Sequence, residues 1–270
     1  MDFICPKCRG ELSPGGASYI CPSGHTFDVA RAGYINLLPP SGPSGHGDNK
    51  EMLTARRRFL DTGHYLPLAE RICELAKKYI KPHSAVIDVG CGEGYYTDKL
   101  ERMLAMRDGD SRVSALDISK DAVRYAGARN KSVSCAVASA YDVPSRDGAF
   151  SAAVNVFSPL AREEMLRILD TGGVFIVAFP AEEHLFGLKA AIYDTPYKNE
   201  PQPLYLDGFE LLWSERVTYT VSLTSSEQIR DLFMMTPYAY RTKNENKERV
   251  LSLSSLKTEA DFYICVYKKV

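Results

Sequence analysis

Five short apolar runs, separated by segments with helical spacing, dominate the middle of the chain. They are Ala85–Val89, Val113–Leu116, Val133–Ala138, Ala152–Val156 and Gly173–Ala178. Continuous apolar runs of this length are typical of parallel strands that are buried on both faces. After the first run, Tyr96, Leu100 and Met103 recur at the spacing of one helix face. The pattern therefore predicts a doubly wound α/β sheet.

Two further stretches near the C-terminus, Val217–Val221 and Asp261–Lys268, alternate or run apolar like strands. Between them, Ser225–Met235 begins with a capping residue and continues with helical spacing. We expect these stretches to complete a seven-stranded sheet with one helix between its last two strands.

Three glycines follow the first apolar run, in the order Asp88-x-Gly90-x-Gly92-x-Gly94. Alternate glycines allow a sharp strand-to-helix turn and leave room for a ligand against the backbone. Dinucleotide turns instead use G-x-G-x-x-G around a pyrophosphate, which the carboxylate of Asp88 would repel. That carboxylate suits a cationic amino-acid end, and Asp117 at the tip of the second run suits ribose hydroxyls. A NAD-binding domain and a domain without activity are the alternatives.

Cys5, Cys8, Cys21 and His25 form a C-x2-C-x12-C-x3-H pattern near the N-terminus. Two tight pairs separated by a short loop can supply four tetrahedral ligands to one Zn²⁺. Because four protein ligands close the coordination sphere, we predict one structural zinc ion per chain in a module over residues 1–38. The remaining cysteines lie in apolar stretches and are predicted to be core residues.

The composition is that of a globular chain, with 45% hydrophobic and 25% charged residues. Seven cysteines and no export signal indicate a reducing compartment, so we expect a cytoplasmic protein. A net charge of −1 means that any nucleic-acid binding must rest on local patches. Residues 39–49, rich in Pro, Gly and Ser, are predicted to be a flexible linker before a catalytic domain over 50–270. Arg56, Arg57 and Arg58 are candidates for binding RNA phosphates, although such a run can also be a solvated helix face.

The glycine turn resembles motif I of class I S-adenosylmethionine-dependent methyltransferases, whose Rossmann-like sheet has seven strands. Nearly the whole chain resembles the 23S rRNA (guanine-N1)-methyltransferases of the RlmA type, which include macrolide-resistance homologues. The zinc pattern, Gly33–Leu38, Gly63-His64-Tyr65, Asp88–Thr97 and His184-Leu185 carry the resemblance. It implies S-adenosylmethionine as cofactor, 23S rRNA as partner and a homodimer. The cofactor-binding residues implied by the motif and the resemblance are Tyr65, Asp88, Gly90, Gly92, Glu93, Gly94, Tyr96, Thr97, Asp117 and His184.

The expected reaction is methylation of guanine N1 in a hairpin loop of the helix 35 region. The hydrogen on N1 must leave, and the candidates to assist it are Asn155, Ser158, Glu182, Glu183 and His184, among which the sequence does not choose. Tyr193, Tyr197 and Tyr205 could stack on a base or be core or lid aromatics. A small-molecule methyltransferase and an RNA-binding adaptor without activity are the competing hypotheses.

Overall fold

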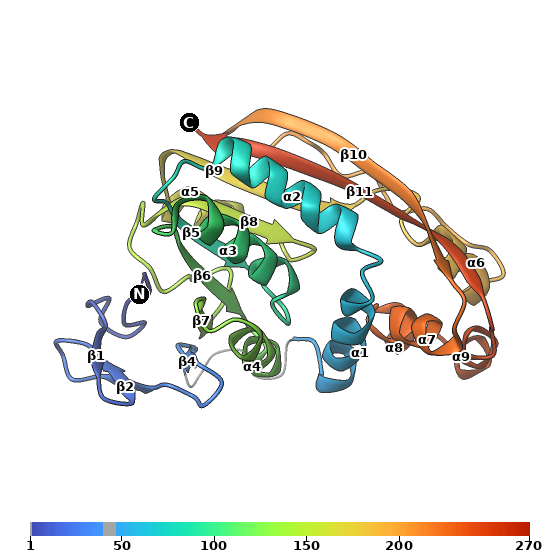
Figure 1. The fold of residues 1–270 in the computed structure, drawn as a ribbon, viewed down its shortest axis with the longest axis horizontal. Helices are drawn as coiled ribbons and strands as arrows, with labels where there is room; N and C mark the ends of the chain where they lie inside the picture. The colour runs from blue at the N-terminus through green and yellow to red at the C-terminus, as the bar shows by residue number, and fades with distance from the viewer. Residues whose placement is uncertain (1, 40–46) are drawn as a thin grey trace.

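The computed structural model describes residues 2–39 and 47–270 (Figure 1), so most of the predicted linker, residues 40–46, lies outside the described residues. The main sheet has eight strands in the order β10-β11-β9-β8-β5-β6-β7-β4. Seven are the predicted ones: β5 (Ala85–Val89), β6 (Arg112–Asp117), β7 (Ser134–Val137), β8 (Phe150–Val156), β9 (Leu169–Pro180), β10 (Phe209–Leu223) and β11 (Leu256–Lys269). β5 to β9 pair in parallel, whereas β10 and β11 pair antiparallel. The predicted doubly wound sheet is confirmed.

Helices cover both faces of this sheet (Figure 1). The helices of the described residues are α1 (Lys50–Asp61), α2 (Leu66–Tyr79), α3 (Tyr95–Asp108), α4 (Lys120–Arg129), α5 (Arg162–Ile168), α6 (Phe186–Ile192), α7 (Ser226–Met234), α8 (Tyr238–Arg241) and α9 (Asn244–Leu251). Of these, α1, α8 and α9 pack mainly against other helices. Neighbouring residues of β5 belong to separate cores, Val86 to one and Ile87 to the other, and both are fully buried. This two-sided burial explains why the strand is apolar without alternation. Among the described residues, no helix has the length and apolarity needed to cross a membrane.

The N-terminal segment supplies the eighth strand of the main sheet. Its own small sheet consists of β1 (Ser13–Gly15), β2 (Ser18–Ile20) and β3 (Thr26–Asp28), each three residues long. The chain then continues into β4 (Tyr34–Asn36), which pairs in parallel with β7. The metal-binding segment is therefore joined to the catalytic sheet by backbone hydrogen bonds, an arrangement that the sequence pattern did not predict.

Candidate active site and metal centre

A cavity of about 1570 Å³ opens where the parallel strands of the main sheet end. Asp88 at the end of β5, Asp117 at the end of β6 and Val156 at the end of β8 all line it. Ligands of open α/β sheets bind at this carboxyl edge, because the strand-to-helix turns diverge there and leave a crevice. Eight of the ten predicted cofactor-binding residues line the cavity: Tyr65, Asp88, Gly90, Gly92, Glu93, Tyr96, Asp117 and His184.

The glycine turn lines this cavity, and neighbouring segments approach it closely at Gly90 and at Gly94. Gly90 has a φ of +83°, and a Cβ there would lie 2.3 Å from the Ser158 side chain. Gly94 has a φ of +87° at the start of α3, and its Cβ would lie 2.8 Å from the Cα of Ala126 in α4. Both positions therefore need glycine for backbone conformation and for space. Gly94 does not line the cavity; it allows α3 and α4 to pack closely.

Asp88 and Asp117 present carboxylates that are oriented by hydrogen bonds. The Thr97 hydroxyl donates to Asp88 at 2.5 Å, so Thr97 acts on the cavity through Asp88 without lining it. The backbone N–H groups of Gly92 and Ser119 donate to Asp117 at 3.0 and 2.8 Å. Burial raises the pKa of Asp88 to about 7 and also raises the pKa of Asp117. A cationic ligand beside Asp88 would offset this cost of burying charge.

His184 and Tyr65 meet in the wall of the cavity. The Tyr65 hydroxyl lies 3.4 Å from His184 Nε2, and the backbone N–H of Asp261 donates to His184 Nδ1 at 3.4 Å. Because Nδ1 accepts, the proton of the neutral ring lies on Nε2. Burial lowers the pKa of His184 to about 3. His184 is therefore neutral near pH 7 and suited to positioning the tyrosine.

Several residues that were not predicted to bind the cofactor also line the cavity. Asp48 and Arg56 form an ion pair at its wall, and Arg56 also donates to the Met235 carbonyl. Phe157 lies just after β8 with a φ of +58°, unusual for a non-glycine residue, and its ring is 6.3 Å from that of His184. In the sequence, the one signal for Phe157 is its position directly after a predicted strand. Its left-handed backbone conformation results from tertiary packing, which a local pattern does not reveal.

The connection between α6 and β10 covers another part of the cavity and brings in Tyr197 and Tyr205. Lys189 of α6 is fully buried, and its Nζ donates to the Tyr197 carbonyl at 3.1 Å and to Asn199 Oδ1 at 2.6 Å. The Asn199 amide in turn donates to the Ala181 carbonyl at 2.7 Å. The buried Lys189 ammonium group therefore holds the connection against α6 through these hydrogen bonds. Tyr193 packs against Tyr197 at 5.5 Å and does not line the cavity.

The three consecutive arginines of α1 point in different directions. Arg56 faces the cavity, as described above. Arg57 lies over the Tyr125 ring at 5.6 Å, and Arg58 donates to Asp231 at 2.8 Å from Nε. Of the three arginines, Arg57 and Arg58 therefore face away from the cavity and toward the protein surface.

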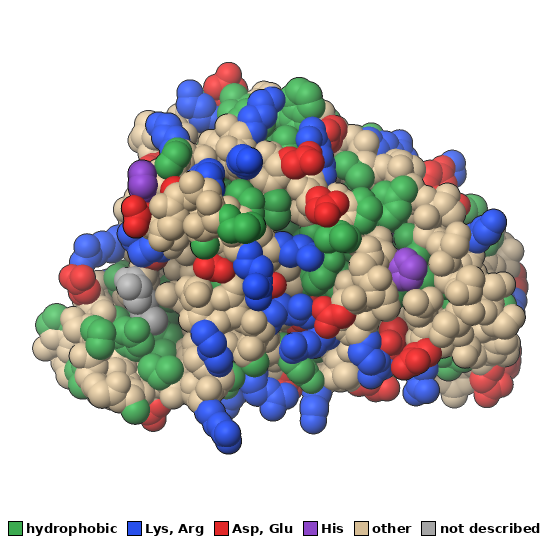
Figure 2. All heavy atoms as spheres, viewed as in Figure 1, with side chains coloured by type: hydrophobic (Ala, Val, Ile, Leu, Met, Phe, Trp, Pro, Cys, Tyr) green, Lys and Arg blue, Asp and Glu red, His purple; other side chains and the backbone are tan. Residues whose placement is uncertain are grey.

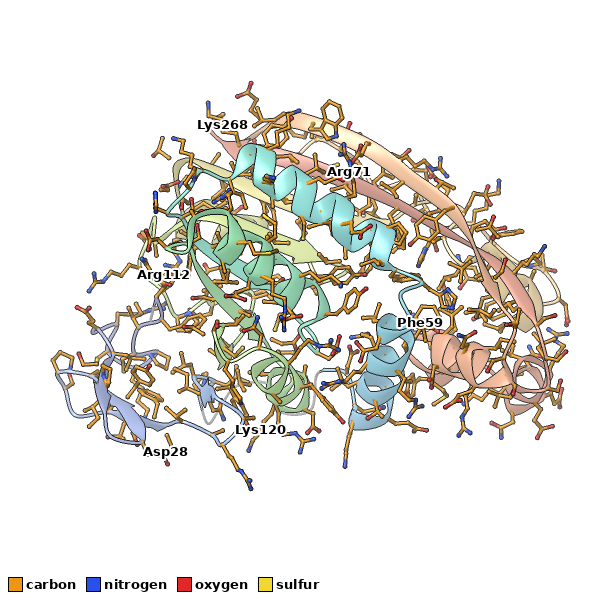
Figure 3. All side chains as sticks on the ribbon, in the orientation of Figure 1. Asp28, Phe59, Arg71, Arg112, Lys120 and Lys268 are labelled. Atoms are coloured by element: carbon orange, nitrogen blue, oxygen red, sulfur yellow. The ribbon has the colours of Figure 1, made fainter. Side chains whose placement is uncertain are left out.

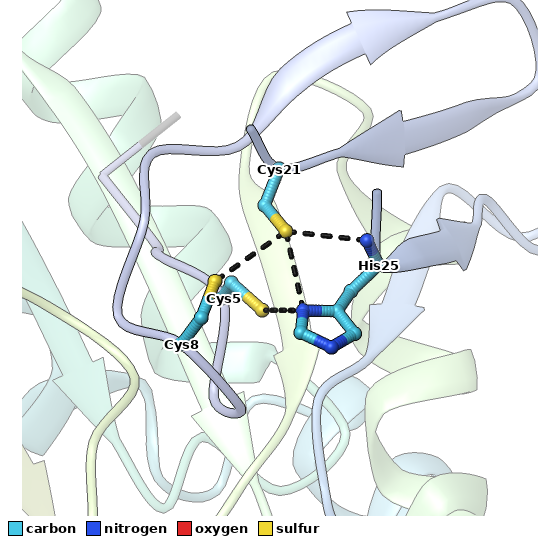
Figure 4. Close-up of side chains that lie close together, drawn as sticks. All are labelled: Cys5, Cys8, Cys21 and His25. Carbon is cyan, nitrogen blue, oxygen red and sulfur yellow. Dashed lines mark hydrogen bonds between the residues drawn. The ribbon is translucent and has the colours of Figure 1, made fainter. Parts of the chain in front are cut away.

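The four predicted metal ligands converge at one point in the N-terminal module (Figure 4). Their ligand atoms all lie within 4.8 Å of one another. His25 Nδ1 lies 3.4 Å from Cys5 Sγ and 3.3 Å from Cys21 Sγ, and Cys8 Sγ lies 3.5 Å from Cys21 Sγ. Tetrahedral zinc with Zn–S bonds of about 2.3 Å requires sulfur separations of roughly 3.8 Å. The distance of 3.5 Å between Cys8 Sγ and Cys21 Sγ is close to this value.

The surroundings of these side chains also suit a zinc ion. The backbone N–H of His25 donates to Cys21 Sγ at 3.3 Å, as expected of a knuckle that stabilises a thiolate. Hydrogen bonds from the Ser23 side chain and the Gly10 backbone lower the pKa of the Cys8 thiol to about 6. Zinc binds the thiolate form. The residues therefore fit the predicted structural ion, with no position left for a catalytic water.

We expect the affinity for S-adenosylmethionine to fall as the pH drops from about 7.5 to about 5.5, by up to about tenfold per pH unit. Below the raised pKa of Asp88, about 7, the free protein holds a neutral carboxyl that must lose its proton to face a cation. Calorimetric titration across this range measures the effect. Asp88→Asn should bind more weakly near neutral pH and show a flatter pH dependence. An affinity of the unmodified protein that is constant with pH would contradict the prediction.

Comparisons with known proteins agree with this geometry. The family model described as "RlmA, N-terminal", a zinc ribbon, matches residues 3–41, and a "Methyltransferase domain" model matches residues 86–173. The YcgJ protein of Bacillus subtilis shares the fold with a TM-score of 0.50 and 12% identity, over 74% of this chain and 98% of that chain.

Two curated relatives are more similar in sequence. The 23S rRNA (guanine(748)-N(1))-methyltransferase of Streptomyces fradiae is 40% identical over 191 residues, which cover 70% of this chain and 66% of that protein. YxjB of Bacillus subtilis strain 168, provisionally named a 23S rRNA (guanine-N1)-methyltransferase, is 30% identical over 95% of this chain and 92% of its own length. The catalytic domain is thus an S-adenosylmethionine-dependent methyltransferase, and the chain belongs to the RlmA-type family of 23S rRNA (guanine-N1)-methyltransferases.

Proposed function

We propose that the protein methylates N1 of a guanine in a hairpin loop of 23S rRNA, in the helix 35 region. The observation that carries this proposal is an RlmA-type ribbon docked beside a methyltransferase cavity in one chain. A small-molecule methyltransferase would leave the ribbon without a role. The names of the relatives from Streptomyces fradiae and Bacillus subtilis support the same substrate class. A homodimer stays a prediction from the family resemblance.

The size and rim of the cavity suit a base that has been turned out of its stack. Small-molecule sites commonly measure about 300–1,000 Å³, so a cavity of about 1570 Å³ has room for the cofactor and a second nucleoside. Four aromatic side chains line it while remaining exposed: Tyr141 at 66%, Phe157 at 40%, Tyr197 at 52% and Tyr205 at 78%. Aromatic faces of this kind stack on unpaired bases. A loop guanine is accessible to such a site without the opening of a base pair.

Of the five candidates to assist loss of the N1 hydrogen, Asn155, Ser158 and His184 line the cavity. Glu182 and Glu183 pair with cationic side chains instead. The Ser158 hydroxyl donates its hydrogen to a backbone carbonyl at 2.7 Å, and both His184 nitrogens have partners. These contacts favour Asn155.

The surroundings of Asn155 fix which way its amide points. Nδ2 donates to the carbonyls of Val89 and Pro159 at 3.4 and 3.2 Å and to Ser158 Oγ at 2.6 Å. Because backbone carbonyls only accept, the amide nitrogen must face them. Oδ1 accepts no hydrogen bond from the described part of the chain and is available to a ligand. S-adenosylmethionine supplies the methyl group, while Asn155 Oδ1 orients the N1–H of guanine and the proton passes to water.

The proposed RNA-binding surface lies over α1 and α4, where Lys and Arg side chains gather in the lower middle of Figure 2. Arg57 and Arg124 lie over the same Tyr125 ring, at 5.6 and 5.5 Å. Arg58 and Lys120 are exposed on the same two helices. Cations held at the surface in this way can contact several phosphates of one RNA backbone.

Transfer of labelled methyl groups to 23S rRNA from a strain lacking this enzyme tests the proposed function. We expect 1-methylguanosine in a single fragment from the helix 35 region, identified by mass mapping of nucleosides. Label that enters only small molecules of an RNA-free extract would favour the small-molecule hypothesis. Absence of any transfer by cofactor-bound protein would favour the adaptor without activity.

Asn155→Ala should lower kcat by about 100-fold, because the base loses the group that orients N1–H. The Kd for cofactor and the KM for RNA should change little, since neither depends on this contact in the proposed role. Steady-state kinetics measure all three quantities. Asn130→Ala, which removes a buried asparagine that does not line the cavity, is the control and should keep its kcat. An unchanged kcat for Asn155→Ala would exclude the role.

Arg57→Ala should weaken RNA binding and reduce the slope of log affinity against log salt by roughly 0.7–0.9, the value for one phosphate contact. Fluorescence anisotropy with a helix 35 hairpin at several salt concentrations measures the slope. Arg112 is exposed at the amino end of β6, whereas Lys120 begins α4 just after the carboxyl end of that strand, away from Arg112 in Figure 3. Arg112→Ala should therefore leave the slope unchanged. Equal slopes for all three proteins would contradict the assignment.

A further inference from the structure

The connection between β7 and β8 has two faces, and different parts of the molecule contact each. Ser139, Ala140 and Tyr141 line the active-site cavity. Asp142, Val143, Pro144 and Arg146 contact the N-terminal metal-binding ribbon instead. Residues 139–146 are called the adenine-side loop here, because Ser139 to Pro144 resemble the segment that faces adenine in class I methyltransferases.

The ribbon contacts the adenine-side loop through hydrogen bonds and apolar packing. Arg9 donates from Nη2 to Asp142 Oδ1 at 2.8 Å and from Nη1 to the Val143 carbonyl at 3.4 Å. The backbone N–H of Ile4 donates to the Pro144 carbonyl at 2.7 Å. Phe3 and Cys5, on either side of Ile4, are buried in the same core cluster as Val143. These contacts join the ribbon to the loop by backbone, side-chain and apolar interactions.

The position of Arg9 is set by the metal knuckle. Arg9 directly follows the ligand Cys8 and has a φ of +56°, a left-handed conformation that a knuckle turn requires. Its backbone N–H donates to the Cys5 carbonyl at 2.8 Å, and the Cys5 N–H donates to the Gly10 carbonyl at 2.8 Å. The turn that presents two metal ligands is therefore the turn that aims the Arg9 side chain. The strands of the ribbon are only three residues long, so its shape depends on the metal.

The adenine-side loop also has a support that is independent of the ribbon. Glu164 of α5 accepts from the Val143 N–H at 2.6 Å, and Arg167 donates to the Val143 carbonyl at 2.7 Å. Loss of the ribbon contacts should therefore loosen the loop without displacing it completely.

We propose that the ribbon positions the cofactor pocket: the metal-ordered knuckle holds the adenine-side loop through Arg9, and zinc loading thereby raises the affinity for S-adenosylmethionine. The ribbon then acts on the methyl donor's site in addition to any contact with RNA. Arg9 is a positioning residue in this proposal, because it contacts the back of the loop and not the cavity. The inference rests on the placement of adenine against this loop and is independent of which RNA is methylated.

The test measures cofactor affinity in the full-length, zinc-loaded chain without RNA. We expect Arg9→Ala to weaken binding of S-adenosylmethionine by about 3- to 10-fold, the scale of one ordinary intramolecular hydrogen bond. Hydrogen exchange of the backbone amides of residues 139–143 and 145 should become faster. Lys7→Ala, an exposed change in the same knuckle, is the matched control and should bind like the unmodified protein. Arg9→Lys should recover part of the affinity.

The second part of the test removes zinc with a chelator and compares cofactor affinity before and after. Metal content and thermal melting are recorded for each protein. Chelation should weaken cofactor binding in the unmodified chain and have a smaller effect on Arg9→Ala, which has already lost the contact. Tight binding by zinc-loaded Arg9→Ala would overturn the proposal, even if chelation weakened the unmodified protein. Equal weakening by Lys7→Ala would also overturn it, because the effect would then belong to the knuckle in general.

Discussion

The turn from Gly90 to Gly94 lets two neighbouring segments approach its backbone closely, because its glycines carry no side chain. A Cβ at Gly90 would meet Ser158, and one at Gly94 would meet the backbone of α4. A left-handed conformation alone costs a residue with a Cβ about 1–2 kcal/mol, and these clashes would add to it. The ends of β5 and β8 and the packing of α3 against α4 are thus set by one backbone geometry, and the shape of the cavity follows from it.

The electrostatics of the cavity follow from how deeply this turn is buried. Asp88 and Asp117 lie there with raised pKa values, oriented by Thr97 and by backbone N–H groups. His184 has a lowered pKa and a fixed tautomer. Asp88 can therefore receive the cationic end of a ligand, while the neutral ring of His184 adds no positive charge to the cavity.

The N-terminal segment is both a metal module and a part of the catalytic sheet. β4 extends the sheet beside β7, and the knuckle reaches the connection that leaves β7 at its carboxyl end. Because both contacts involve the same strand and the loop that follows it, the ribbon is anchored to the wall of the cofactor site. This arrangement gives a structural metal ion a physical route to a binding site that it does not touch.

Local sequence patterns determine the strands of the main sheet and the spacing of the metal ligands in this protein. The predicted strands are confirmed and the four predicted metal ligands converge, because apolar runs and ligand spacing act over a few residues. The eighth strand, the divergence of Arg56 from Arg57 and Arg58, the orientation of the Asn155 amide and the pairing of Arg9 with Asp142 were decided by the tertiary structure. Arg9 and Asp142 are 133 residues apart, and Asn155 donates to a carbonyl 66 residues away. Such contacts depend on how strands are ordered in the sheet, and no local spacing in the chain encodes them.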